Sequence, residues 1–64
     1  MQKWEYCELA RHGRDAEVEF FKTNKSSETK SGKFDQLVAW LGENGWELAV
    51  AEGKWYLFKR PKSK

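Results

Sequence analysis

The sequence predicts a small α+β domain of order ββαββ, in which one helix packs on one face of a four-stranded antiparallel sheet. Two pairs of segments alternate apolar and polar residues, as half-buried strands do, and glycine-containing turns join the members of each pair. Between the pairs, apolar residues follow a helical spacing. A chain of 64 residues has room for one domain only.

The first pair of strands is expected at residues 3–10 and 16–22. The second strand is the clearer one, because apolar residues alternate with glutamates from Ala16 to Phe20. A short polar segment containing Gly13 separates the two strands, and glycine tolerates the positive φ of a tight turn. These features predict a hairpin.

A polar segment follows the first hairpin. Residues 23–32 contain no apolar side chain, so this segment has nothing to bury. We therefore expect a mobile, solvent-exposed loop.

A helix is expected next, on the evidence of one apolar stripe at positions i, i+3, i+4 and i+7: Phe34, Leu37, Val38 and Leu41. Ser31 or Gly32 can cap its start, and Asp35 in the first turn favours the helix dipole.

The end of the helix is specified by Gly45 and Trp46. Gly45 suits the left-handed C′ position of a Schellman motif, which makes Trp46 the C″ residue and Leu41 its apolar partner. We predict that Leu41, Gly45 and Trp46 are the structural centre of the fold.

The second pair of strands is expected at residues 46–51 and 54–60, with a tight turn at Glu52–Gly53. Pro61 lacks the backbone donor that a further strand residue would need, which leaves residues 61–64 as a basic tail. Strand order 2-1-3-4 is expected, because it makes all neighbours antiparallel.

Three short motifs give the chain a family resemblance. It resembles small bacterial and phage domains of unknown function, which share a WEY start, a GWEL centre and an aromatic-basic close. The resemblance covers nearly the whole chain except residues 23–32, where this chain has its own lysine-rich loop. It implies a ββαββ fold and supplies no catalytic residues to transfer. The matching residues are Trp4-Glu5-Tyr6, then Leu37, Leu41-Gly42 and Gly45-Trp46-Glu47-Leu48, and finally Tyr56 and Phe58-Lys59-Arg60.

Several function classes are disfavoured by the composition. The longest apolar run has five residues, Leu37 to Leu41, too short to cross a membrane, and the first residues do not form a signal peptide. The single cysteine, Cys7, cannot form an internal disulfide, so we expect a reducing, cytoplasmic location. Cys7 and His12 lack the spacing of a metal site. They lie about 16 Å apart along an extended strand, too far to act as nucleophile and base.

We therefore expect no enzyme, no cofactor and no metal. Glu17 and Glu19 share one strand face, which is typical of a solvated face or a protected sheet edge.

Positive charge gathers at residues 22–33 and 59–64, although the net charge is only +2. These clusters can bind phosphate or can serve solubility alone.

The aromatic residues carry the strongest functional signal. One helix covers one face of a sheet, yet Trp55 and Tyr56 point to opposite faces, as do Phe20 and Phe21. Large rings must therefore remain on the uncovered face. A second subunit, a flat ligand such as a nucleobase, or lysine side chains could cover them.

These observations favour a non-enzymatic binding module that forms homo-oligomers through its aromatic sheet face. The alternative is a nucleotide or nucleic-acid binder, which could include a nucleotide-sequestering protein, with stacked aromatics and basic loop or tail residues. The candidate ligand or interface residues are Phe21, Tyr56, Phe58, Lys59, Arg60, Lys22 and Lys30.

Overall fold

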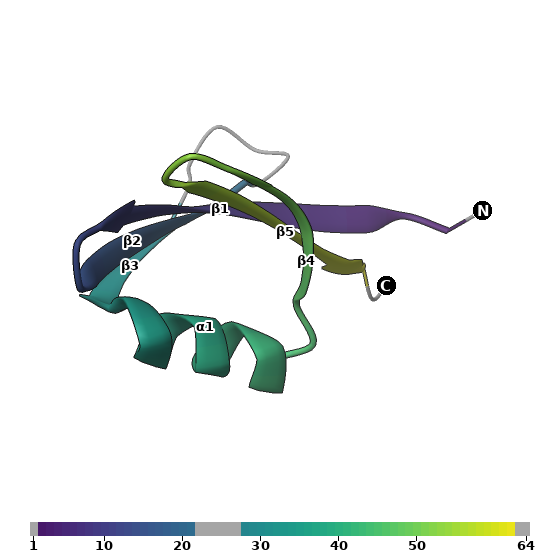
Figure 1. Ribbon diagram of the computed structural model, residues 1–64. Helices are drawn as coiled ribbons and strands as arrows, with labels where there is room; N and C mark the ends of the chain where they lie inside the picture. The colour runs from purple at the N-terminus through teal and green to yellow at the C-terminus, as the bar shows by residue number, and fades with distance from the viewer. Residues whose placement is uncertain (1, 22–27, 63–64) are drawn as a thin grey trace.

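The computed structural model describes residues 2–21 and 28–62, which form an α+β domain with one helix and a five-stranded antiparallel sheet (Figure 1). The α+β class and the single helix are confirmed, but the sheet has five strands rather than four. The elements are β1 (Trp4–His12), β2 (Asp15–Phe20), β3 (Glu28–Lys33), α1 (Phe34–Glu43), β4 (Glu47–Glu52) and β5 (Trp55–Pro61).

The additional strand is β3, which occupies part of the segment predicted to be a loop. Its Cα partners on β2 run from Asp15 opposite Lys33 to Phe20 opposite Glu28. All six residues of β3 are exposed. A polar edge strand has no alternation of apolar and polar residues in its sequence. For this reason the hydrophobic pattern does not predict β3. Residues 23–27 of the predicted loop lie outside the described residues.

The observed strand order, β3-β2-β1-β5-β4, replaces the predicted order 2-1-3-4. The chain changes direction after each strand. Because β3 adds one such change, every later element runs opposite to the direction predicted for it. As a result β4 runs parallel to β1, and β5 becomes the antiparallel partner that β1 requires. The rule that neighbours are antiparallel was correct, but it was applied to the wrong number of strands.

Both hairpins turn at a glycine with positive φ. Gly13, with a φ of 66°, lies between His12 and Asp15, which are paired across β1 and β2. Gly53, with a φ of 60°, has the corresponding place between β4 and β5. Both turns therefore use the conformational freedom that glycine alone provides.

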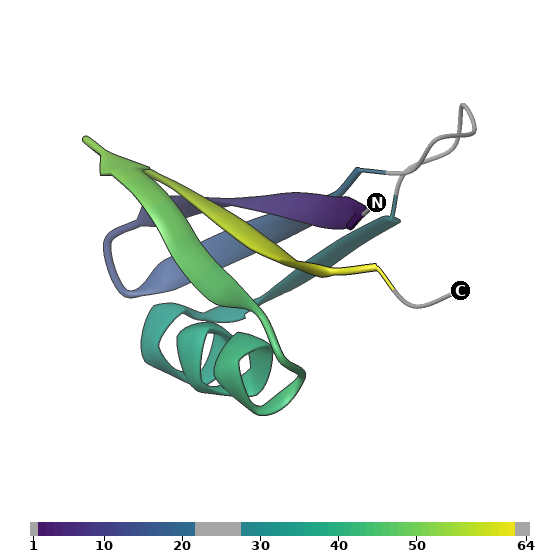
Figure 2. The same cartoon turned by 90° about the vertical axis from the view of Figure 1, so that its right-hand side faces the viewer.

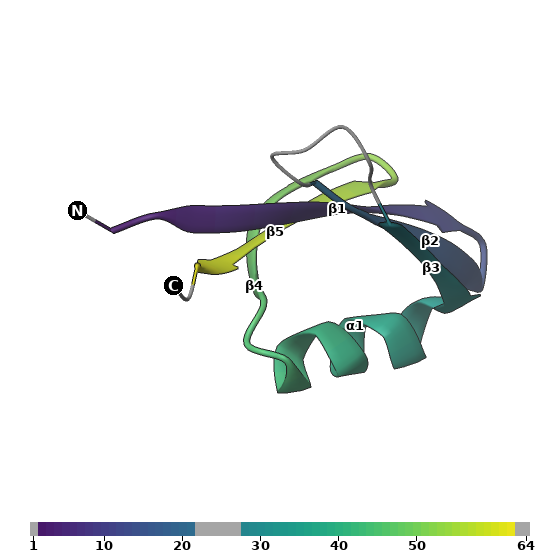
Figure 3. The ribbon, with the colours of Figure 1, turned by 180° about the vertical axis from the view of Figure 1, so that it is seen from behind.

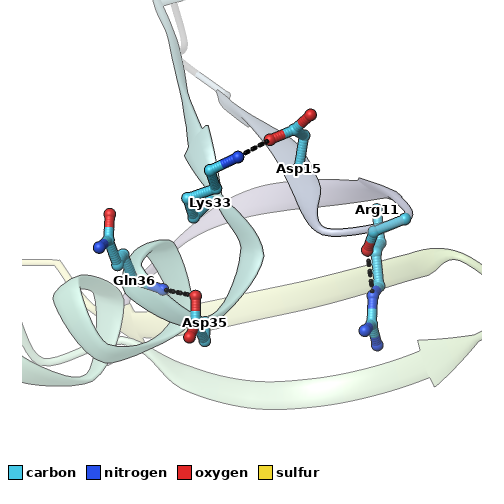
Figure 4. A network of polar contacts seen from close by, with 6 residues as sticks. Arg11, Asp15, Lys33, Asp35 and Gln36 are labelled. Atoms are coloured by element: carbon cyan, nitrogen blue, oxygen red, sulfur yellow. Dashed lines mark hydrogen bonds and ion pairs between the residues drawn. The ribbon is translucent and has the colours of Figure 1, made fainter.

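The helix begins against the first hairpin. Lys33 is its N-cap residue and makes no side-chain cap, whereas the predicted caps Ser31 and Gly32 belong to β3. The backbone N–H of Phe34 instead donates to the carbonyl of Arg14 at 2.7 Å. The Asp35 carboxylate accepts a hydrogen bond from the N–H of Gln36 (Figure 4). The start of α1 is thus fixed by tertiary contact.

The end of the helix confirms the predicted Schellman motif. The N–H of Trp46 donates to the carbonyl of Leu41 at 2.9 Å, and that of Gly45 donates to Gly42 at 3.1 Å. Gly45 has a φ of 86°. Leu41 and Trp46 are both buried, so this motif connects the helix end to the core.

The core lies between α1 and one face of the sheet. Figures 2 and 3 show the helix on one side of the sheet, and no described helix or strand covers the opposite face. Within the described residues, no helix is long and apolar enough to cross a bilayer. The buried apolar residues are Cys7, Leu9, Ala16, Val18, Leu37, Leu41, Trp46 and Phe58.

The last strand continues into the predicted basic tail, of which residues 63–64 lie outside the described residues. Pro61 still pairs with Trp4, at the end of β5. The N–H of Lys62 donates to the carbonyl of Lys3 at 2.9 Å, so backbone pairing continues past the proline. Both ends of the described chain therefore lie side by side.

Candidate ligand groove

The structure settles which aromatic residues of β5 face the helix. Phe58 is 5% exposed and belongs to the core, and Tyr56 packs against that core with its ring 5.4 Å from that of Phe34. Phe58 and Tyr56, two of the candidate ligand or interface residues, therefore lie on the helix-facing side of the sheet and not on its uncovered face. Their partners on β1, Cys7 and Leu9, are fully buried, which fixes the alternation of β5.

The uncovered side of the sheet, here called the open face, carries the other set of β5 residues. Trp55 and Lys59 lie on it, and the paired β1 residues Ala10 and Tyr6 share this face. The alternation of β1 adds Trp4, and Phe21 lies beside Tyr6, to whose carbonyl its N–H donates. The exposed rings of this face are Trp4 (40%), Tyr6 (40%), Phe21 (44%) and Trp55 (47%).

One end of the sheet is hollowed into a groove of about 660 Å³. Six of the ten aromatic residues in the chain line this aromatic groove: Trp4, Tyr6, Phe20, Phe21, Trp40 and Trp46. Its polar lining consists of Glu5, Glu28, Asn44, Arg60 and Lys62. The volume lies in the range of about 300–1,000 Å³ that small-molecule sites occupy.

The groove exists because the strands are staggered. β1 begins at Trp4, but its pairing with β2 begins only at Cys7, opposite Phe20. The first residues of β1 therefore have no β2 residue beside them. The helix also ends here, and Trp46 follows it into the core. Phe20 connects the two sides, with ring contacts of 6.1 Å to Trp40 and 5.8 Å to Trp46.

Each tryptophan of the groove has a cation over its ring. The Lys59 ammonium lies 4.6 Å from the ring centre of Trp4, and the Lys30 ammonium lies 4.9 Å from that of Trp40. The Arg60 guanidinium lies 4.3 Å from the ring centre of Trp46. On the uncovered face, the Lys59 side chain thus shields part of Trp4, which is one of the three expected means of cover.

Arg60 is held in place by three contacts. Besides stacking on Trp46, its Nε donates to the Glu5 carboxylate at 2.6 Å, and its Nη1 donates to the carbonyl of Asn44. Asn44 is the C-cap of α1, so the guanidinium supplies positive charge at the negative end of the helix. Arg60 therefore has a structural role in addition to its place in the groove.

The two parts of the sheet differ in charge. Two cations, Arg60 and Lys62, line the groove, and two more, Lys30 and Lys59, lie over its tryptophans, against the carboxylates of Glu5 and Glu28. The open face beyond the groove is acidic instead, with Glu8 directly opposite Glu19, and Glu17 two residues further along β2. An anionic ligand is therefore attracted to the groove rather than to the centre of the open face.

A second hollow, of about 470 Å³, lies at the start of the helix. Arg11, Arg14 and Lys33 are the cations that line it, and two of the three already have partners. Lys33 pairs with Asp15 at 3.1 Å, and the Arg11 guanidinium donates to the carbonyl of Gly13 and lies 4.0 Å from the ring centre of Phe34. We therefore interpret the hollow as part of the junction between the helix and the first hairpin.

The structure keeps Cys7 away from His12. Cys7 is fully buried on the helix-facing side of β1, and His12 lies at the exposed end of the strand on the opposite face. Burial raises the pKa of the Cys7 thiol from 9.0 to about 12; the nearby Arg60 opposes this effect and Glu5 adds to it. In the described part of the chain, no three His, Cys, Asp or Glu side chains gather to hold a metal ion.

The candidate residues predicted from the sequence divide between groove, core and surface. Phe21 and Arg60 line the groove, while Lys30 and Lys59 lie on two of its tryptophans. Lys22 lies outside the described residues. The sequence reasoning missed Trp4, Tyr6 and Trp40, although the alternation of β1 and the helical spacing placed all three away from the core.

Comparison with known proteins returns no match among protein-family models, curated proteins or solved structures. The resemblance to small bacterial and phage domains stays a prediction.

Proposed function

We propose that the protein is a non-enzymatic binding module whose aromatic groove holds a nucleotide, with the base stacked on exposed rings and the phosphate near the lysines. The observation that carries this proposal is the gathering of six aromatic side chains in one groove at the cationic end of the sheet. Short single-stranded nucleic acid shares this chemistry, since each of its units is a nucleotide.

Four rings of the groove have surface available for stacking. Tyr6, Phe21, Trp4 and Trp40 are 36–44% exposed, whereas Trp46 is buried and forms part of the floor. A flat base can replace water on such rings, and stacking of this kind contributes about 1–3 kcal/mol per base. Tyr6 and Phe21 are the best candidates for stacking on the base, because no cation of the described residues lies over either ring.

Lys62 is the best candidate for the phosphate. It lines the groove, and within the described residues its ammonium makes no ion pair. Arg60 is less available, because Glu5 and Asn44 already accept two of its hydrogen bonds. Lys59 and Lys30 can move from the tryptophan rings to a phosphate at small energetic cost, since an exposed cation–π contact contributes only about 0.5–1 kcal/mol.

The proposal is tested by fluorescence titration with thymidine monophosphate and with a short oligothymidylate, each at two salt concentrations. Phe21→Ala should weaken binding by about 5- to 150-fold, the equivalent of one lost stacking contact. Lys62→Gln should reduce the salt dependence by about one phosphate contact. A preference for the oligomer would identify single-stranded nucleic acid as the ligand, and equal affinity would identify the mononucleotide.

Matched controls come from the other end of the sheet. Trp55→Ala removes an exposed ring outside the groove, and Lys54→Gln removes the cation that lies 5.6 Å from the ring centre of Trp55. Both variants should bind like the parent. Absence of saturable binding by the parent, or equal losses for Trp55→Ala and Phe21→Ala, would overturn the proposal.

A second candidate function is self-association through the open face. It is favoured by Trp55 and Val50, which are 47% and 52% exposed on this face and lie outside the groove. The acidic residues of β1 and β2 on the same face oppose it, because a twofold axis through the middle of the face would bring Glu8 and Glu19 against their copies. For this reason we rank it below ligand binding.

Sedimentation equilibrium decides this second candidate. At about 100 μM, well above a micromolar dissociation constant, a self-associating protein would be largely oligomeric. Trp55→Glu should then give a folded monomer, because Trp55 lies on the uncovered face. A monomeric parent at this concentration would exclude the second candidate.

A further inference from the structure

The two edges of the sheet differ in their readiness to accept another strand. β3 forms one edge and consists of polar residues that include Lys30 and Lys33, the kind of composition that discourages strand addition. β4 forms the other edge, the green strand in the foreground of Figure 2. It has the sequence ELAVAE and contains neither lysine nor proline.

The β4 edge is exposed along its whole length. All six of its residues are exposed, with Leu48 at 49% and Val50 at 52%. One side of the strand pairs with β5, with a register shift between Leu48 and Val50, and among the described residues no strand lies against the backbone donors and acceptors of the other side. An apolar strand edge of this kind is a template for β-augmentation.

Charge decides what can occupy this edge. Glu47 and Glu52 flank the apolar centre, and their partners on β5, Lys59 and Trp55, place both carboxylates on the open face. A second copy that pairs antiparallel with all six residues would set Glu47 against Glu52 of the copy at both ends. Like charges directly opposite each other destabilise a strand pair, so the sequence of β4 opposes self-pairing.

We propose that β4 is a docking edge for an extended segment of another protein, with an apolar centre and a lysine or arginine opposite each of Glu47 and Glu52. On the β5 side, Glu47 already has a lysine directly opposite it, Lys59, whereas Glu52 lies opposite Trp55. The site is separate from the aromatic groove, which contains no β4 residue among its lining. Its occupation therefore does not require nucleotide binding.

The test is an NMR titration of the full chain with two synthetic peptides that share a valine-threonine centre. One peptide has lysine at both ends of the segment, and the other has glutamate. The lysine peptide should shift the amide signals of β4 and bind at least about tenfold more tightly than the glutamate peptide. The double variant Glu47→Lys, Glu52→Lys should reverse this preference, and circular dichroism of the variant would confirm that it remains folded.

Three results would overturn the proposal. The first is an absence of β4 shifts with the lysine peptide. The second is equal binding of both peptides. The third is a concentration dependence of the β4 signals without peptide, which would identify a second copy as the occupant.

Discussion

Arg60 shows how one side chain joins three parts of the fold. Its guanidinium stacks on Trp46 and donates hydrogen bonds to Glu5 on β1 and to Asn44 at the helix end. The side chains of Arg60 and Glu5 are 33% and 29% exposed, so this ion pair is partly protected from water. A planar group with several donors is needed to make all these contacts together.

We therefore expect Arg60→Lys to lower the free energy of unfolding by about 1–2 kcal/mol, because lysine keeps the charge but not the geometry. Lys33→Gln is the matched control, since the Lys33–Asp15 pair is 59% and 69% exposed and should contribute little. Urea unfolding measures both. Equal stability of Arg60→Lys and the parent would show that charge alone matters at this position.

Cys7 makes stability depend on pH in the alkaline range. Burial raises its pKa from 9.0 to about 12 in the folded chain, so the unfolded chain loses the thiol proton first. The contribution of the neutral thiol is therefore complete below pH 9.0 and is lost as the pH rises toward about 12. The loss should approach about 1.4 kcal/mol for each pH unit in that window.

The measurement is urea unfolding of the parent and of Cys7→Ala over the alkaline range. Other groups titrate in both proteins, so the difference between the two curves isolates Cys7. The free energy of unfolding of the parent should fall more steeply than that of the variant. Parallel curves would mean that the thiol titrates alike in the folded and unfolded chains.

The sequence identifies the apolar residues of a strand, but it does not always show which face of the sheet their side chains lie on. In β5 both alternating sets contain large apolar residues, Trp55 and Leu57 in one and Tyr56 and Phe58 in the other. Nothing in β5 alone shows which set faces the helix. The decision comes from β1, where Cys7 and Leu9 are buried and pair with Phe58 and Tyr56.

Among the elements, the helix was predictable and its beginning was not. The apolar stripe and the Gly45-Trp46 pair are local signals, and the structure confirms both. The start depends on the hydrogen bond from Phe34 to Arg14, which joins residues far apart in sequence. Capping patterns describe local bonds only, so they placed the start at Ser31 or Gly32.

Two glycines test the helix end. Gly45 has a φ of 86° and Gly42 lies within the helix, yet an added Cβ would have no atom within 4 Å at either position. We expect Gly45→Ala to destabilise the protein by about 1–2 kcal/mol and Gly42→Ala to stabilise it by up to about 1 kcal/mol. Thermal unfolding measures both variants. A stable Gly45→Ala protein would mean that the Schellman motif is not required.

The strand missed by the pattern analysis had the largest consequence for the topology. β3 contains no apolar side chain, and it is held by backbone pairing with β2. Its omission changed the predicted direction of β4 and β5 and therefore the strand order. Polar edge strands are the elements for which periodicity gives least information.

Across the whole molecule, charge and aromatic surface are arranged together. Lys30, Lys59 and Arg60 lie with the aromatic groove at one end of the sheet, and Glu8, Glu17 and Glu19 lie along the open face. Composition alone predicted an aromatic surface with basic residues near it. The position of the groove could not be predicted, because it results from the stagger of β1 and β2 and from the return of the chain at Trp46.

The four tryptophans allow a direct test of the ligand groove. Trp4, Trp40 and Trp46 line the groove, and Trp55 lies outside it. Each indole N–H gives its own NMR signal, so one titration with the nucleotide or oligonucleotide observes site and control together. We predict that the three groove signals shift in a saturable manner while the Trp55 signal stays in place. Unchanged groove signals, or a Trp55 signal that shifts equally, would contradict the assignment of ligand binding to the aromatic groove.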